Sequence, residues 1–153
     1  MIALNSKAPS IELNTDTEWF SLKNNLGKKI IVFFFPRADT SGCTAESIEF
    51  STFIKEFKAL NTIVIGISKD TPEKQKKFKK KYDLSCILGA DNETDVCERY
   101  GVWVEKSMYG KKYWGIQRST FLIDETGKII HIWPKVKVPN HAKDVLETVK
   151  NLN

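Results

Sequence analysis

The sequence has little cysteine, little histidine and no long apolar run. Its three cysteines, Cys43, Cys86 and Cys97, are too few for a disulfide scaffold and form neither a Cys-x-x-Cys pair nor zinc-finger spacing. The longest apolar run, Ile30 to Phe35, has six residues, whereas a membrane span needs about 18 or more. The first residues lead directly into polar ones, without a signal-peptide apolar region. We therefore expect a cytoplasmic thiol protein that enters no membrane.

The composition is that of an ordinary globular domain. The chain has 153 residues, of which 41% are hydrophobic and 28% charged, and contains no linker, repeat or low-complexity segment. We therefore expect one domain over residues 1–153. The net charge of +5 includes one dense lysine run, Lys74 to Lys81, which is typical of a solvated helix face. We expect no nucleic-acid partner, because no recognised module accompanies that run.

The order of strand and helix patterns predicts an α/β fold. Continuous β-branched and aromatic residues predict buried strands at Ile30–Phe35 and Thr62–Ile67, and helical periodicity predicts an amphipathic helix over Cys43–Leu60. Such a strand, helix and strand make a right-handed crossover, so the sheet is at least partly parallel. The other expected elements are an N-terminal hairpin (11–13 and 19–22), a helix beginning at Thr71 and Pro72, a strand (84–88), a short helix (94–100), a long loop (102–115), a second hairpin (118–123 and 128–133) and a closing helix (141–152). This order predicts a thioredoxin-like fold with an N-terminal β-hairpin extension.

The segment from Pro36 to Cys43 carries the clearest chemical pattern. It runs from the end of a predicted buried strand to the first turn of a helix, where reaction sites of α/β sheets lie. Free backbone N–H groups and the helix dipole favour a thiolate at Cys43. The hydroxyl of Thr40 is placed to hydrogen-bond this thiolate or an oxygen attached to it, and Gly42 permits close approach of a small ligand. Pro36 shields the pocket from water without adding an N–H donor.

Helical spacing also places Glu46 on the apolar side of the same helix, beside Cys43. A buried carboxylate requires a partner, and our candidate is Arg118, which begins a strand expected in the same sheet. Its guanidinium also favours the thiolate and supplies donors to a developing negative oxygen. The competing interpretation is a buried structural cysteine and a surface arginine.

Two segments of the chain resemble a known family. The spacing Pro36-x-x-x-Thr40-x-x-Cys43 matches the peroxiredoxin active-site pattern, and residues 34–46 and 100–124 are similar to the peroxiredoxin Q subfamily, also called bacterioferritin comigratory proteins. The resemblance covers essentially the whole chain. It implies a thiol-dependent peroxidase in which Cys43 is the peroxidatic cysteine, Thr40 and Arg118 activate it and bind peroxide, and Pro36 shields it. The expected reaction takes hydrogen peroxide or an alkyl hydroperoxide to a sulfenic acid on Cys43, as antioxidant defence.

The chain departs from this subfamily in its resolving cysteine. Members of the subfamily carry one five residues after the peroxidatic cysteine or on the following helix, where this chain has Ile48 and Lys79. Cys86 alternates with buried positions and is expected to pack in the core. Cys97 is a resolving candidate, expected to be half exposed, although its acidic neighbours raise a thiol pKa. We favour an external thiol, namely thioredoxin, glutaredoxin or glutathione.

Two other functions are weighed against this interpretation. A thioredoxin-like disulfide reductase needs a second cysteine two residues away, and Cys43-Thr-Ala-Glu46 has none. A non-catalytic binding module would use the lysine-rich helix to hold an acidic partner. The two histidines, His131 and His141, accompany no carboxylate cluster, so no metal or other cofactor is expected.

Overall fold

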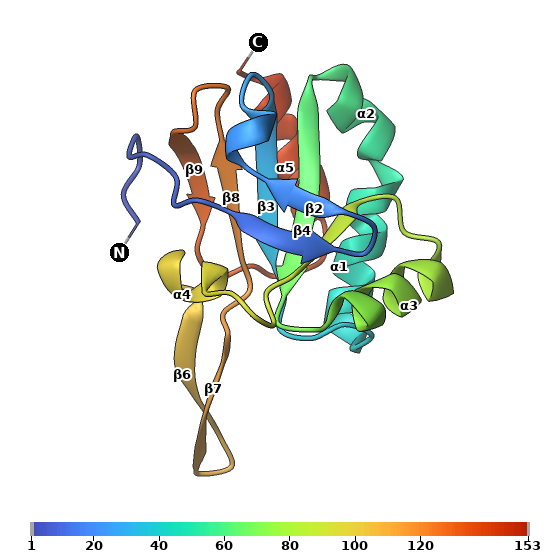
Figure 1. Ribbon diagram of the computed structural model, residues 1–153, viewed down its shortest axis with the longest axis vertical. Coiled ribbons are helices and arrows are strands. Elements are labelled where there is room, and N and C mark those ends of the chain that lie inside the picture. Colours follow the sequence, from blue (N-terminus) through green and yellow to red (C-terminus); the bar gives the residue numbers. More distant parts are fainter. Residues whose placement is uncertain (1, 153) are drawn as a thin grey trace.

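The structure, a computed structural model, describes residues 2–152 of the protein. Its centre is a seven-stranded mixed sheet (Figure 1). The strand order is β2-β1-β5-β4-β3-β8-β9. The strands are β1 (Glu12–Thr15), β2 (Trp19–Ser21), β3 (Lys29–Phe34), β4 (Thr62–Ser68), β5 (Ile87–Ala90), β8 (Ser119–Ile123) and β9 (Ile129–Trp133), and a separate two-stranded sheet consists of β6 (Trp103–Met108) and β7 (Lys111–Ile116). The helices are α1 (Ser41–Thr52), α2 (Ile54–Ala59), α3 (Pro72–Tyr82), α4 (Val96–Arg99) and α5 (His141–Lys150), with a 3₁₀ turn η1 at Lys23–Asn25. Among these described residues, no helix is long and apolar enough to cross a bilayer.

The centre of the sheet is parallel, as the strand patterns predict. All six residues of β3 are buried, and β3 pairs with β4 in parallel, as β4 does with β5. The pairing places Phe33 opposite Gly66, where an added Cβ would lie 2.4 Å from Phe33 Cζ. Glycine therefore makes room for the Phe33 ring, which stacks on Phe50 of α1 at a centroid distance of 4.4 Å. The strand, helix and strand unit is held together by this contact.

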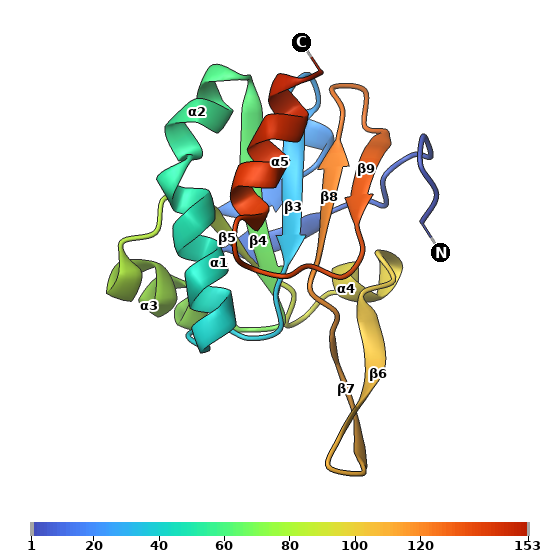
Figure 2. The ribbon, with the colours of Figure 1, turned by 180° about the vertical axis from the view of Figure 1, so that it is seen from behind.

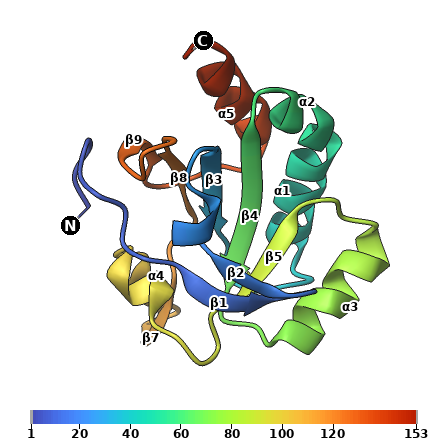
Figure 3. The ribbon, with the colours of Figure 1, turned by 45° about the horizontal axis from the view of Figure 1, so that its top comes forward.

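Two apolar clusters cover the two faces of the sheet. Helices α1, α2, α3 and α5 contribute to one cluster, which contains Cys43, and these helices lie on one side of the sheet (Figure 2). The other cluster contains Cys97 of α4 and apolar residues of the N-terminal hairpin, which lie on the opposite side (Figure 3). Because β3 and β4 are buried on both faces, their side chains join both clusters.

The N-terminal hairpin belongs to the main sheet. Its strands β1 and β2 pair with each other, and β1 also pairs with β5 in antiparallel register through Asn14 and Thr15. The hairpin is thus an extension in sequence that lengthens the sheet in space. Strand β5 begins at Ile87, so Cys86 lies just before it instead of in the middle of a strand over 84–88.

The prediction of one continuous helix over Cys43–Leu60 is wrong, because this segment forms two helices, α1 and α2, separated at Phe53. Phe53 has φ −99° and ψ 10°, outside the helical range. Just before the break, the Thr52 hydroxyl donates to Ile48 O at 2.9 Å, a bond that bends helices. The break lets α2 turn while its Phe57 stays in the core.

The prediction of a long loop over 102–115 is also wrong, because β6 and β7 form a hairpin there. Tyr109 and Gly110, at its turn, both have positive φ, as a two-residue turn between strands of this twist requires. Most of the hairpin is exposed, so its strands show no apolar alternation in the sequence. It projects beyond the end of the sheet at which β3 ends and α1 begins (Figures 1 and 2).

The remaining elements confirm the sequence pattern with small shifts of their ends. Thr71 caps α3 through its hydroxyl, which accepts from Lys74 N at 3.2 Å, and α5 begins at His141 as expected. Glu49 of α1 accepts from the backbone N–H groups of Asn140 and Ala142 at the start of α5. This carboxylate holds the last helix against the first.

Candidate active site

Cys43 lies at the point predicted for it, in the first turn of α1 beyond the end of β3. Thr40 is the N-cap residue, in an extended conformation, and its carbonyl accepts from Thr44 N at 2.8 Å. Cys43 is 0% exposed and packs in the apolar cluster with Phe35 and Phe50. The thiol is thus at the positive end of a helix dipole and out of bulk water.

Arg118 joins Cys43 to Glu46. Its Nη2 atom donates to Cys43 Sγ at 3.3 Å, and its Nη1 atom donates to Glu46 Oε1 at 2.6 Å. Strand β8 delivers the arginine, because the pairing of Phe34 with Ser119 places the residue before Ser119 next to the end of β3. One guanidinium therefore contacts both the sulfur and the carboxylate, which confirms the predicted contact between Glu46 and a basic partner.

Glu46 is 1% exposed, and its second carboxylate oxygen, Oε2, has no hydrogen-bond partner among residues 2–152. Burial raises the pKa of Glu46 to about 7, although the adjacent Arg118 charge and hydrogen bond act in the opposite direction. The cost of removing this carboxylate from water thus exceeds what the ion pair returns. The carboxylate fixes the guanidinium in place at some cost to stability.

Thr40 and Pro36 belong to the segment that leads from β3 into α1. The Thr40 hydroxyl donates to Arg37 O at 2.9 Å rather than to Cys43 Sγ, and Thr40 is exposed. Pro36 follows the last buried residues after β3 and is partly buried. A bond from Thr40 to an oxygen attached to the sulfur, and shielding by Pro36, stay predictions.

Lys106, on β6, is a further cation near the thiol that the sequence does not single out. Its Nζ atom donates to Ile116 O, and its charge interacts with both Arg118 and Cys43. Burial and the Arg118 charge lower the pKa of Lys106. Lys106 comes near the thiol because β6 pairs with β7. A sequence pattern for this hairpin would therefore be needed to predict its position.

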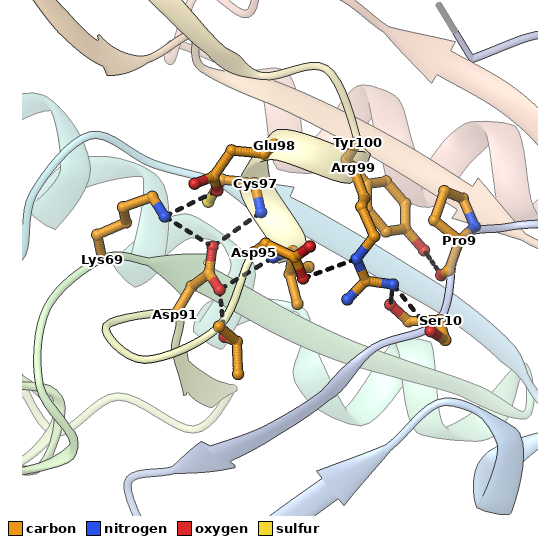
Figure 4. Close-up of polar contacts among 11 residues, drawn as sticks. Pro9, Ser10, Lys69, Asp91, Asp95, Cys97, Glu98, Arg99 and Tyr100 are labelled. Atoms are coloured by element: carbon orange, nitrogen blue, oxygen red, sulfur yellow. Dashed lines mark hydrogen bonds and ion pairs between the residues drawn. The ribbon is translucent and has the colours of Figure 1, made fainter.

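Cys97 is fully buried, so the prediction that it is half exposed is wrong. Asp91 accepts from Cys97 N at 2.8 Å and from Val96 N at 3.0 Å, and so holds the start of α4 against the core. Figure 4 shows the Asp91 carboxylate directed at the backbone of Cys97. Burial, and next the Asp91 charge, raise the pKa of the Cys97 thiol far above its ordinary value. Cys97 also belongs to the apolar cluster on the face of the sheet opposite Cys43.

Cys86 packs in the core, as its alternation predicts. It shares the cluster of Cys43 and is 0% exposed, but its sulfur accepts from the Ser51 hydroxyl near the far end of α1, at 3.7 Å. Ser51 and Cys43 are eight residues apart on that helix, a rise of about 12 Å. Burial raises the pKa of Cys86 to about 11. All three cysteines are free thiols.

Comparisons with known proteins agree on one family. A model of the AhpC/TSA family matches residues 4–132. The chain is 46% identical over 146 residues to the putative peroxiredoxin bcp of Coxiella burnetii (95% of this chain, 97% of the relative) and 41% identical over 153 residues to peroxiredoxin Bcp of Bacillus subtilis (99% and 98%).

Solved structures agree with these relatives. A mutant of Xylella fastidiosa PrxQ superposes with a TM-score of 0.93 at 29% identity, covering 99% of this chain and 98% of its own. The bacterioferritin comigratory protein of Xanthomonas campestris, described for its alkyl peroxide reduction activity, superposes with a TM-score of 0.88 at 31% identity, covering 93% and 91%.

The fold is that of the thioredoxin-like peroxiredoxins. The chain belongs to the AhpC/TSA family of peroxiredoxins, in its peroxiredoxin Q or Bcp group. Peroxiredoxins reduce peroxides with electrons from a thiol, so the protein is a thiol-dependent peroxidase, and the non-catalytic binding module is not favoured.

Gly42→Ala tests how closely Arg118 must approach the thiol. An added Cβ at residue 42 would lie 3.2 Å from Arg118 Nη2, the atom that donates to Cys43. We expect peroxide reduction to slow by about tenfold, because a displacement of a few tenths of an ångström misaligns the donor. Stability should stay the same or rise by up to about 1 kcal/mol, because alanine favours a helix. Peroxidase rates and urea unfolding measure the two effects. Ala45→Gly, at an exposed position of α1, is the control, with lower stability and an unchanged rate.

Glu46 should make stability depend on pH between its unfolded and folded pKa values. The folded pKa is about 7 and the ordinary value 4.5, so the folded chain binds more protons in this window and the free energy of unfolding falls as pH rises through it. The fall amounts to about 3 kcal/mol and is absent in Glu46→Gln. Urea unfolding of both proteins at pH 4.5 and pH 7.5 isolates this contribution. A difference between them that stays constant, or that grows in favour of the wild type, would show that burial does not raise the pKa of Glu46.

Proposed function

We propose that Cys43 is the peroxidatic cysteine and that Arg118 is its activating partner. The observation that carries this proposal is the contact between Arg118 Nη2 and Cys43 Sγ at 3.3 Å, at the N-terminus of α1. A cation and a helix dipole at the same sulfur favour the thiolate, which is the reactive form. Neither Cys86 nor Cys97 has such surroundings, since burial raises the pKa of both thiols.

In the proposed reaction the Cys43 thiolate attacks the terminal oxygen of hydrogen peroxide or an alkyl hydroperoxide. A sulfur–oxygen bond forms as the peroxide O–O bond breaks, and the leaving oxygen takes a proton and departs as water or alcohol. Cys43 is thereby oxidised to a sulfenic acid. The alkyl substrate is supported by the activity described for the Xanthomonas campestris relative.

The rate requires more than a thiolate, because nucleophilicity falls as the pKa of a thiol falls. Arg118 is placed to donate to the peroxide oxygens while negative charge develops on them. Thr40 would donate to the attached oxygen after its hydroxyl turns away from Arg37 O. Glu46 acts through Arg118 as a positioning residue, and Pro36 limits the access of water.

We propose that an external thiol reduces the sulfenic acid. Cys97 lies across the sheet and Cys86 lies near the other end of α1, so both would need large rearrangements to reach Cys43. Thioredoxin, glutaredoxin and glutathione are the candidate reductants. Such reductants belong to the cytoplasm, where free thiols persist, and we propose that the protein acts there.

Cys43→Ser should remove peroxidase turnover, by at least about a thousandfold, because serine has no accessible anion near neutral pH. The fold should remain, since serine occupies nearly the same volume. Peroxide consumption, together with near-UV circular dichroism, checks both points. Substantial activity in the folded variant would refute the assignment of Cys43.

Cys86→Ala and Cys97→Ala, alone and combined, should keep turnover within about twofold of the wild type when an external thiol is supplied. Mass spectrometry after one equivalent of peroxide should show Cys43 as a sulfenic acid or as a mixed disulfide with the added thiol. A Cys43–Cys97 or Cys43–Cys86 cross-linked peptide, with lost turnover in the matching variant, would overturn the external route.

A further inference from the structure

A groove of about 360 Å³ lies beside the proposed active-site loop, between that loop and α3. Four basic side chains line it: Arg37 from the loop, and Lys74, Lys77 and Lys81 from α3. The peroxidase chemistry uses none of them. Their common location in one groove needs an explanation beyond a solvated helix face.

Two acidic residues also line the groove, but both carboxylates accept hydrogen bonds from other groups of the protein. Asp70 Oδ2 accepts from Ala38 N at 2.7 Å and from Ser68 Oγ at 2.6 Å, which ties the loop to the segment before α3. Asp39 accepts from Lys81 Nζ at 2.9 Å and from the Tyr82 hydroxyl.

The remaining cations are unneutralised. Within residues 2–152, the side chains of Arg37, Lys74 and Lys77 form no ion pair with any carboxylate. The groove therefore carries an excess of positive charge, which favours an anionic ligand.

The groove and the thiol lie on the same face of the sheet. Phe78, which lines the groove, packs in the same apolar cluster as Cys43. Asp39 precedes Cys43 by four residues, so even a fully extended chain would separate their Cα atoms by about 14 Å at most. An extended ligand of three residues spans about 10 Å. The groove thus begins at a distance from Cys43 that is comparable with the length of such a ligand.

We propose that this groove binds the carboxylates of a small anionic thiol, of the chemistry of glutathione, and so directs its sulfur to oxidised Cys43. The volume is that of a small-ligand site, and Cys43 is 0% exposed, which favours a small reductant over a folded protein. The inference rests on the proposed function, because it needs the Cys43 sulfenic acid as the oxidant.

The reaction balances with that thiol as the reductant. Its sulfur attacks the Cys43 sulfur, an S–S bond forms, and the S–O bond breaks. The hydroxide that leaves takes the thiol proton and departs as water. A second thiol molecule then attacks the mixed disulfide, which returns Cys43 as a thiol and releases the disulfide of the small thiol.

Helix α3 provides a matched control for the test. At 100° per residue, Lys74, Lys77 and Lys81 fall within an arc of about 60° on the groove side, whereas the exposed Lys76 and Lys80 lie outside it and do not line the groove. Lys74→Gln/Lys77→Gln and Lys76→Gln/Lys80→Gln remove the same charge from the same helix, and glutamine has a similar helix propensity.

The measurement is peroxide turnover at limiting thiol, with glutathione and with the neutral 2-mercaptoethanol. We expect Lys74→Gln/Lys77→Gln to lose about tenfold with glutathione and nothing with 2-mercaptoethanol, and Lys76→Gln/Lys80→Gln to match the wild type with both. The loss should shrink as salt is raised. Oxidation of Cys43 by peroxide in a single turnover should be equal in all three proteins.

Each of the other outcomes would contradict the proposal that the groove binds the small thiol. Equal losses in both pairs would show a general charge effect, and equal losses with both thiols would show a structural one. A loss that appears with thioredoxin as reductant and not with glutathione would assign the surface to a protein partner. Normal single-turnover oxidation without any glutathione effect would reject the groove alone, whereas absent oxidation of Cys43 would reject the proposed function.

Discussion

The two hydrogen bonds of Arg118, to Cys43 Sγ and to Glu46 Oε1, are the interaction on which the site depends. They require two elements to meet: the first turn of α1 supplies the sulfur and the carboxylate, and the residue before β8 supplies the guanidinium. Antiparallel pairing of β3 with β8 fixes this meeting, because it holds the start of β8 beside the end of β3. A slip of one residue in that pairing would turn every side chain of β8 to the other face. The register of the sheet is thus also a condition on the chemistry.

Burial of Glu46 determines how this ion pair affects stability and geometry. Glu46 is 1% exposed, and the pKa of its carboxyl is raised to about 7 even beside an arginine, so the pair contributes little to stability. Its effect is on geometry, since a guanidinium fixed at one end has few ways to point its other nitrogen. We interpret Glu46 as the group that keeps Arg118 Nη2 directed at the sulfur. Glycine at residue 42 serves the same arrangement, because a larger side chain would meet that nitrogen.

Much of this arrangement could be predicted from the sequence, and the failures have physical causes. The buried strands, the crossover and the contact between Glu46 and Arg118 follow from local patterns, because apolar periodicity and an isolated inward carboxylate are both local signals. The hairpin of β6 and β7 was not predicted because most of its residues are exposed, so its sequence lacks an alternation of apolar and polar residues. The burial of Cys97 escaped it because Asp91, six residues earlier, determines how α4 enters the core, and flanking acids alone suggested exposure. Lys106 depends on both the hairpin and its pairing, so no local pattern could place it.

The positions of the charges around the thiol suggest a division between the two halves of the catalytic cycle. Arg118 and Lys106 are partly buried and interact electrostatically with Cys43, the sulfur that is proposed to attack the peroxide. Arg37, Lys74 and Lys77 lie outside, on the loop and on α3, where they are exposed to solvent. The inner cations act over short distances in surroundings of low dielectric, whereas the outer ones act on a ligand that still holds much of its water. In the proposed cycle the inner cations act on the uncharged peroxide, and an anionic reductant would meet the outer ones first. One short loop, from Pro36 to Thr40, carries Arg37 of the outer set and ends at the N-cap of the helix that holds Cys43, so it connects the two regions.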